Sequence, residues 1–200
     1  MSDTQLQPWS DSMTQRNTVF RTLHELGLAA WFGGTLAGAV AVNGAAAQAS
    51  DPRERLRIAN AGWARWTPVN LAAIGAQLVG TTGVGWGNKG RIVAQKGVAA
   101  SSTAMTGLTV AALGVTAYSR MLGKKLEAAE GQPVEGATEP AAGTAEPASA
   151  AQRRLRVCQW VIPALTGALV VVNALHGEQQ RPGQQLPGLL ARPAQVLGLT

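Results

Sequence analysis

Residues 26–50, LGLAAWFGGTLAGAVAVNGAAAQAS, run for 25 positions without an Asp, Glu, Lys or Arg. A helix needs only ~20 residues to cross the ~30 Å hydrocarbon core of a bilayer. All 17 basic and 11 acidic side chains lie outside this stretch and three others, residues 66–88, 97–119 and 157–177. The segregation of charge predicts an all-α integral membrane protein, a four-helix bundle with spans at about 26–48, 67–87, 97–119 and 157–177.

These stretches are rich in Ala, Gly, Ser and Thr and poor in large apolar residues. The mean hydropathy of the chain is only +0.05. Ala and Gly lie near the threshold of membrane-insertion scales, so a soluble, Ala-rich helical protein is the alternative. Ala47-Gln48-Ala49 has the small-residue pattern of a signal-peptidase site. The apolar run before it is longer than a usual signal core, and we expect it to stay uncleaved.

The domain organisation follows from where the composition changes. Residues 1–21 form a polar N-terminal segment, residues 22–177 the four-helix membrane domain, and residues 178–200 a Pro/Gln-rich tail. Residues 127–150 are Ala, Pro and Glu-rich and contain no large apolar residue except Val134. Such a composition buries too little surface to fold alone, which predicts a disordered loop between the third and fourth helices.

Two proline-containing signals suggest helix starts near the second span. Ser50-Asp51-Pro52 and Thr67-Pro68 both place a capping side chain just before a proline. We therefore expect a short separate helix at 53–66, lying in the membrane interface or forming a basic connector, and a new helix from Thr67.

The net charge of +6 comes from Lys and Arg in the connectors, as beside lipid headgroups. No nucleic-acid-binding module is apparent. The connectors between helices 1–2 and 3–4 carry 10 of the 17 basic residues. The positive-inside rule then places them in the cytoplasm. We predict a multi-pass plasma-membrane protein with both termini outside, and other membrane proteins or further copies of the chain as partners.

Polar side chains recur at a seven-residue spacing, which keeps them on one face of a helix. The stripes are Asn70, Gln77, Thr81 and Asn88; Ser102, Thr106, Thr109 and Thr116; and Gln159, Thr166 and Asn173. Polar groups are costly in hydrocarbon unless paired, so the stripes should face one another. They serve either as interhelical contacts or as the lining of a cavity or ligand site.

Helix-packing residues are predicted on the first helix as well. Trp31, Gly34 and Gly38 share a face there, and the absent glycine side chains would let a neighbouring helix approach. At the far end of the same helix, Asn43 is placed to pair with Asn70. Asn173 lies one turn from His176 and could orient it.

The two histidines, His24 and His176, open the first helix and close the fourth, so an even number of spans places both at one membrane face. They could bind haem iron or copper, or make ordinary interfacial hydrogen bonds. No third metal ligand lies at that level, and no other cofactor is predicted. No Ser–His–acid or Cys–His arrangement is apparent, so no catalytic residue is assigned and the chain is not expected to be an enzyme.

The stretch 24–34, HELGLAAWFGG, resembles the first helix of copper-resistance-D-like and related four-helix bacterial membrane proteins. In these proteins a His seven residues before Trp-x-Gly-Gly opens a span, a pattern matched by His24, Trp31, Gly33 and Gly34. The resemblance implies a four-helix bundle, with copper handling in part of the group. The Met- and His-rich positions that copper transport would need are missing here.

These observations favour a non-enzymatic accessory or scaffold subunit that packs against other membrane proteins. The alternative is a haem- or copper-handling membrane protein that uses the two histidines.

Overall fold

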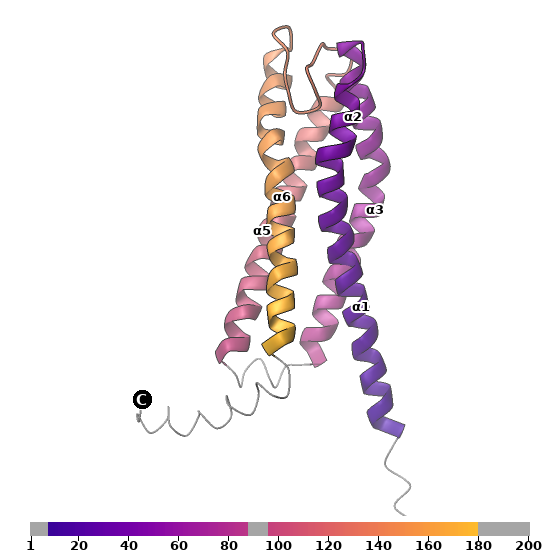
Figure 1. Cartoon of the computed structure of the whole chain (residues 1–200), viewed down its shortest axis with the longest axis vertical. Helices are drawn as coiled ribbons and strands as arrows, with labels where there is room; N and C mark the ends of the chain where they lie inside the picture. Colours follow the sequence, from indigo (N-terminus) through magenta and orange to yellow (C-terminus); the bar gives the residue numbers. More distant parts are fainter. Residues whose placement is uncertain (1–7, 88–95, 180–200) are drawn as a thin grey trace, which may run out of the picture.

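The computed structural model describes residues 8–87 and 96–179. Within these ranges four long helical rods stand side by side in an elongated bundle (Figure 1). The prediction of an all-helical, four-helix fold is confirmed. By length and composition, two segments, Thr18–Ala47 and Glu146–Leu175, could each cross a membrane.

The helices are longer than the predicted spans. The first rod is α1 (Pro8–Ala37), which continues through the π-helix η1 (Gly38–Val42) into α2 (Asn43–Ala47). The other three are α3 (Pro52–Gly87), α5 (Lys96–Glu127) and α6 (Glu146–Gln179). At the end of the bundle where α3 begins and α5 ends, the helices α3, α5 and α6 extend past their charge-free stretches. The residues of the 178–200 tail beyond Gln179, residues 1–7, and Asn88 of the predicted stripe lie outside the described ranges.

The predicted break before Pro68 is wrong, because α3 runs through it without interruption. Proline removes the usual helical partner of the Ala64 carbonyl, but the Thr67 hydroxyl donates to the carbonyl of Trp63 at 2.8 Å. The prediction of a helix start at Pro52 is confirmed, with the Asp51 carboxylate accepting from the Arg53 N–H at 2.9 Å. The indoles of Trp63 and Trp66 before the proline and the backbone at Ala73 after it all pack on the first rod, which holds α3 together across Pro68.

Helices α1 and α3 touch backbone to backbone at two glycines. A Cβ on Gly27 would lie 2.5 Å from the Ala73 carbonyl oxygen, and a Cβ on Gly80 would lie 2.3 Å from the His24 nitrogen. Gly34 and Gly38, predicted to admit a neighbouring helix, instead receive side chains. A Cβ on Gly34 would fall within 1.8 Å of the Trp66 ring. A Cβ on Gly38 would fall within 2.2 Å of the Trp63 ring.

The buried core has a central and an upper part. In the centre, Trp31 is fully buried against Ile74 and Ala112, so this predicted packing residue joins α1, α3 and α5. At the end of the bundle where α3 begins and α5 ends, Leu56, Leu122 and Leu126 form a second cluster. The chain between α5 and α6 completes that cluster.

The predicted disordered loop is folded. Residues 128–145, called the cap segment here, turn over the end of the bundle, and a β-bridge joins Val134 to Pro140. Val134 is 0% exposed within the upper cluster. The ends of the predicted loop belong to α5 and α6. The segment is poor in apolar residues, but the helix ends beneath it supply the surface on which it folds.

A half-buried arginine and a buried glutamine hold the cap segment. The Arg55 guanidinium donates to the carbonyls of Ala49, Val134 and Glu135 at 2.9, 3.2 and 3.2 Å. The fully buried Gln152 amide donates to the carbonyls of Gly136 and Ala137 at 2.9 and 3.3 Å. Backbone groups that no strand or helix satisfies are thereby paired.

Replacing Gly34 by Leu should destabilise the protein, whereas the same change at Gly33 should not. Leu at position 34 must displace the Trp66 ring, an overpacking that lowers the free energy of unfolding by about 1–3 kcal/mol. Gly33 is exposed, and a Cβ there meets nothing within 4 Å. Thermal unfolding in detergent measures both variants, and equal losses would contradict this packing of α1 on α3.

The cap segment should resist a glutamate-specific protease in the native protein. Arg55→Ala removes three hydrogen bonds to backbone carbonyls, so local opening and cleavage at Glu135 and Glu139 should become about tenfold faster. Arg57→Ala is the matched control, because Arg57 pairs with Glu54 and its ion pair is made outside the cap segment. Rapid cleavage of the wild-type protein would instead support the prediction of a disordered loop.

Candidate functional site

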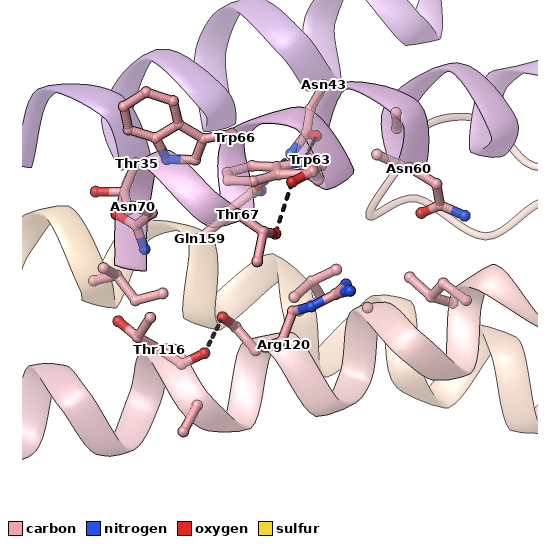
Figure 2. Close-up of a pocket in the computed structure, with 18 of the residues that line it drawn as sticks. Thr35, Asn43, Asn60, Trp63, Trp66, Thr67, Asn70, Thr116, Arg120 and Gln159 are labelled. Carbon is pink, nitrogen blue, oxygen red and sulfur yellow. Dashed lines mark hydrogen bonds between the residues drawn. The ribbon is translucent and has the colours of Figure 1, made fainter. Parts of the chain in front are cut away.

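A cavity of about 420 Å³ lies between α3 and α5 in the half of the bundle next to the cap segment. The pairs α1/α3 and α5/α6 pack closely, whereas α3 and α5 make few contacts with each other. Side chains of α3 and α5 form the facing walls, and those of α1, α2 and α6 form the back (Figure 2). The volume falls within the ~300–1,000 Å³ typical of small-molecule sites.

The cavity lies where the charge-free stretches begin on the cap side. Trp66 opens the second stretch, and Thr116 lies near the end of the third. Arg120 follows directly after that stretch and also lines the cavity. The site therefore runs from the charged end of the bundle into its uncharged part.

Three residues that line the cavity each carry a buried polar atom with no hydrogen-bond partner in the part of the chain that the structure describes. The atoms are the indole Nε1 of Trp66, the amide Oδ1 of Asn70 and the hydroxyl of Thr116. Trp66 and Asn70 are one turn apart on α3, and Thr116 lies across from them on α5 (Figure 2). An unpaired buried polar group costs about 1–3 kcal/mol, so these three residues mark the energetically costly part of the cavity wall.

A satisfied network supports the back wall. Asn43 donates through Nδ2 to Gln159 Oε1 at 2.9 Å and accepts at Oδ1 from the Trp63 indole at 2.8 Å. Gln159 in turn donates to the Thr138 hydroxyl at 3.2 Å. The network connects α2, α3 and α6 to the cap segment. The predicted pairing of Asn43 with Asn70 is wrong, because the polar atoms of Asn43 are bonded to Gln159 and Trp63 instead.

An ion pair closes the outer end of the cavity. The Arg120 guanidinium donates to the Glu127 carboxylate at 2.7 Å, and both side chains line the site. The pair makes the charged part of the described lining neutral overall. Neither residue was singled out from the sequence, where both appear only as connector charges.

Of the two histidines predicted to share a site, His24 has a described side chain. The His24 ring is buried between α1 and α3, with Nδ1 at 2.9 Å from the Thr81 hydroxyl. Thr81 also accepts from the amide of Gln77 at 3.2 Å, so this predicted packing residue joins the same network. The side chain of His176 lies outside the described residues. Among the side chains that are described, no group of three or more His, Cys, Asp and Glu could hold a metal ion.

The side chain of Asn173, on α6, contacts α1. Its amide donates to the Glu25 carboxylate at 2.7 Å. Helices α1 and α6 are neighbours at this contact and where a Cβ on Gly167 would lie 3.2 Å from the Phe32 ring.

Sequence reasoning found part of the cavity. The polar stripes contain Asn70, Thr116 and Gln159, which all line it. Trp66 was not singled out as a site residue from the sequence, and Thr67 was assigned to a helix start. The signal that could have revealed them is their spacing, since Trp63, Trp66, Thr67 and Asn70 recur at three and four residues on one helical face.

Protein-family models, curated proteins and solved structures give no match to this chain. The side chains of the cavity are therefore the basis on which a function can be inferred.

Cysteines placed at Glu25 and Asn173, in a Cys158→Ser background, should be joined by a short thiol-specific bifunctional reagent. The two native side chains are hydrogen-bonded, so the cysteines face each other between α1 and α6. Leu26→Cys with Asn173→Cys is the matched control, because Leu26 is exposed on another face of α1. Gel mobility under non-reducing conditions gives the yield, and equal yields would contradict this helix arrangement.

Proposed function

We propose that this chain is a four-span integral membrane protein that binds a small membrane-soluble molecule in the cavity between α3 and α5. It acts without catalysis, as a membrane-embedded binding subunit. The supporting observation is the cavity itself, whose lining includes three residues that each carry a buried polar atom without a hydrogen-bond partner, Trp66, Asn70 and Thr116. This proposal gives the accessory role predicted from the sequence a specific site.

The distribution of polarity supports insertion of all four helices. Large apolar side chains are exposed on the outside of every rod, among them Leu26, Val40, Leu71, Val79, Val110, Val170 and Val171. Polar side chains such as His24, Gln77 and Thr166 are buried between the rods. A bundle surrounded by lipid favours this arrangement, because lipid covers the apolar faces and each buried polar group needs an internal partner.

The cavity opens sideways between α3 and α5. Leu71 lines it and is nevertheless 64% exposed, and Ala117 on the facing helix is exposed as well. Both residues lie within charge-free stretches. In a bilayer this opening would face lipid, so a ligand could enter from the membrane rather than from water.

The chemistry of the lining suits binding. Its polar groups are amides, hydroxyls and indoles, and its acid, Glu127, is engaged by Arg120. The haem or copper alternative at His24 and His176 has no comparable support. His24 Nδ1 is bonded to Thr81, and its Nε2 is buried where α1 and α3 are in backbone contact.

Protein extracted from its native membrane should carry a bound small molecule. Native mass spectrometry of the detergent-purified protein should show an adduct, and Thr116→Phe should remove it by filling the cavity. Thr106→Phe is the matched control, because Thr106 is exposed on the same helix and bonds its own backbone at Ser102.

Two outcomes would count against the proposal separately. Release of the protein from membranes by alkaline carbonate would contradict four spans. An absent adduct in the wild type, or equal adducts in both Phe variants, would contradict binding in this cavity.

A further inference from the structure

We propose that a groove between α5 and α6 holds the phosphate of an anionic phospholipid at the surface of the bilayer. This groove is separate from the cavity between α3 and α5. The inference rests on the membrane insertion proposed above and not on the binding of a ligand in that cavity.

The groove lies where the last turns of α5 meet the first turns of α6, two helices that pack side by side (Figure 1). It has a volume of about 520 Å³. Buried side chains such as Leu122 and Ala151 line its floor, and the exposed residues Lys125 of α5 and Arg154 of α6 line it as well. Each of the two helices therefore contributes one cation to the same hollow.

The two cations of the groove have no acidic partner among the described residues, unlike the basic residues around them. Three of the six basic residues between positions 120 and 156 form ion pairs, namely Arg120 with Glu127, Arg153 with Glu146 and Arg156 with Glu139. The guanidinium of Arg154 donates instead to the Tyr118 hydroxyl at 3.5 Å. The acid next to the groove along the chain, Glu146, is already engaged by Arg153 and the Ser149 hydroxyl. The positive charge of the groove is therefore not neutralised by the protein.

Two like charges on one groove favour an anion between them. The charges repel each other, and an anion placed between them adds an attraction to each. The helix dipole accounts for a basic residue in the last turn of α5, but it does not account for Arg154, which lies about two turns after the start of α6. Arginine and lysine are also the side chains that bind phosphate oxygens in proteins.

The surface beside the groove suits the acyl chains of a lipid. Tyr118, Met121 and Lys125 recur at three and four residues on one face of α5, and Val157 lies one turn after Arg154 on α6. Tyr118, Met121 and Val157 are exposed. An apolar and aromatic surface therefore continues from the two cations toward the charge-free part of the bundle.

The depth of the two cations fits the phosphate of a phospholipid. Lys125 lies about 9 Å along α5 beyond Ser119, the end of the charge-free stretch, and Arg154 lies about 4–5 Å before Val157, where the stretch of α6 begins. Headgroups occupy roughly 5–8 Å outside the hydrocarbon core. A phospholipid phosphate lies in this layer, whereas the carboxylate of a free fatty acid lies at the hydrocarbon boundary. The orientation predicted from the basic connectors also places this end of the bundle at the cytoplasmic leaflet, which carries anionic lipids.

The test uses the full-length protein in detergent and native mass spectrometry at increasing probe concentration. The probes are dioleoyl phosphatidylglycerol, dioleoyl phosphatidylcholine, oleate and inorganic phosphate. The two phospholipids share their chains and phosphate, but only phosphatidylglycerol has a net negative charge. It should bind the wild type about 25-fold more tightly than phosphatidylcholine, since each basic side chain near an anionic surface contributes about a factor of five. Neither oleate nor inorganic phosphate should displace it at equal concentration.

Variants of the two cations locate the site. Lys125→Gln and Arg154→Gln should each lower the preference for phosphatidylglycerol about fivefold, and the double variant should bind both phospholipids equally. Lys125→Arg combined with Arg154→Lys keeps both charges and should keep the preference. Arg53→Gln combined with Arg65→Gln is the matched control, because it removes the same charge from exposed positions of α3 at the same end of the bundle, outside the groove.

Each contrary result has a distinct meaning. Equal binding of the two phospholipids by the wild type, or an equal loss of preference in the double Gln variant and its control, would overturn the groove as a lipid site. Displacement of phosphatidylglycerol by oleate or inorganic phosphate at equal concentration would overturn a phospholipid as its ligand.

The groove and the cavity are tested apart by Thr116→Phe, which fills the cavity and should leave the preference for phosphatidylglycerol intact. Loss of the preference in this variant would place the lipid in the cavity and overturn the groove site. Release of the protein from membranes by alkaline carbonate would instead contradict the four spans on which both proposals rest.

Discussion

The indole rings of Trp63 and Trp66 lie over Gly38 and Gly34, and the cavity depends on this contact. Each ring occupies the space that a side chain on α1 would take, so α3 is held against α1 rather than against α5. With the Trp63 nitrogen bound to Asn43 and both residues lining the cavity, the same contact supplies both the support of the site and part of its wall.

The sequence predicted the helices well because their determinant, the absence of charge over more than 20 residues, is local. It failed where the determinant is tertiary. Pro68 predicts a helix start by its own chemistry, yet α3 continues because residues on both sides of the proline pack on α1. The composition of the cap segment predicts disorder, yet Arg55 and Gln152 pair its backbone from the helices beneath.

The same difference between local and tertiary determinants applies to the candidate site. A seven-residue spacing identifies an inward face but not the partner across from it, so the stripes contained Asn70, Thr116 and Gln159 without showing that they share one cavity. Asn43 was paired with the wrong residue for this reason, since membrane depth alone placed it opposite Asn70. The partners became visible only once α6 was known to lie beside α2.

Buried polar atoms without partners also occur away from the cavity, on His24, Trp31, Gln77 and Gln152. These residues differ from Trp66, Asn70 and Thr116 because they do not line it. Helices α1 and α3 close over His24 and Gln77 with their backbones in contact, so a ligand could reach these groups only by separating the helices. Where α3 and α5 stand apart, a ligand instead adds hydrogen bonds that the two helices do not make with each other. Binding at 100 times the dissociation constant stabilises a protein by about 2.7 kcal/mol. In this bundle that energy would act across its least packed interface, so the ligand would serve as the contact between α3 and α5 that the side chains leave unmade.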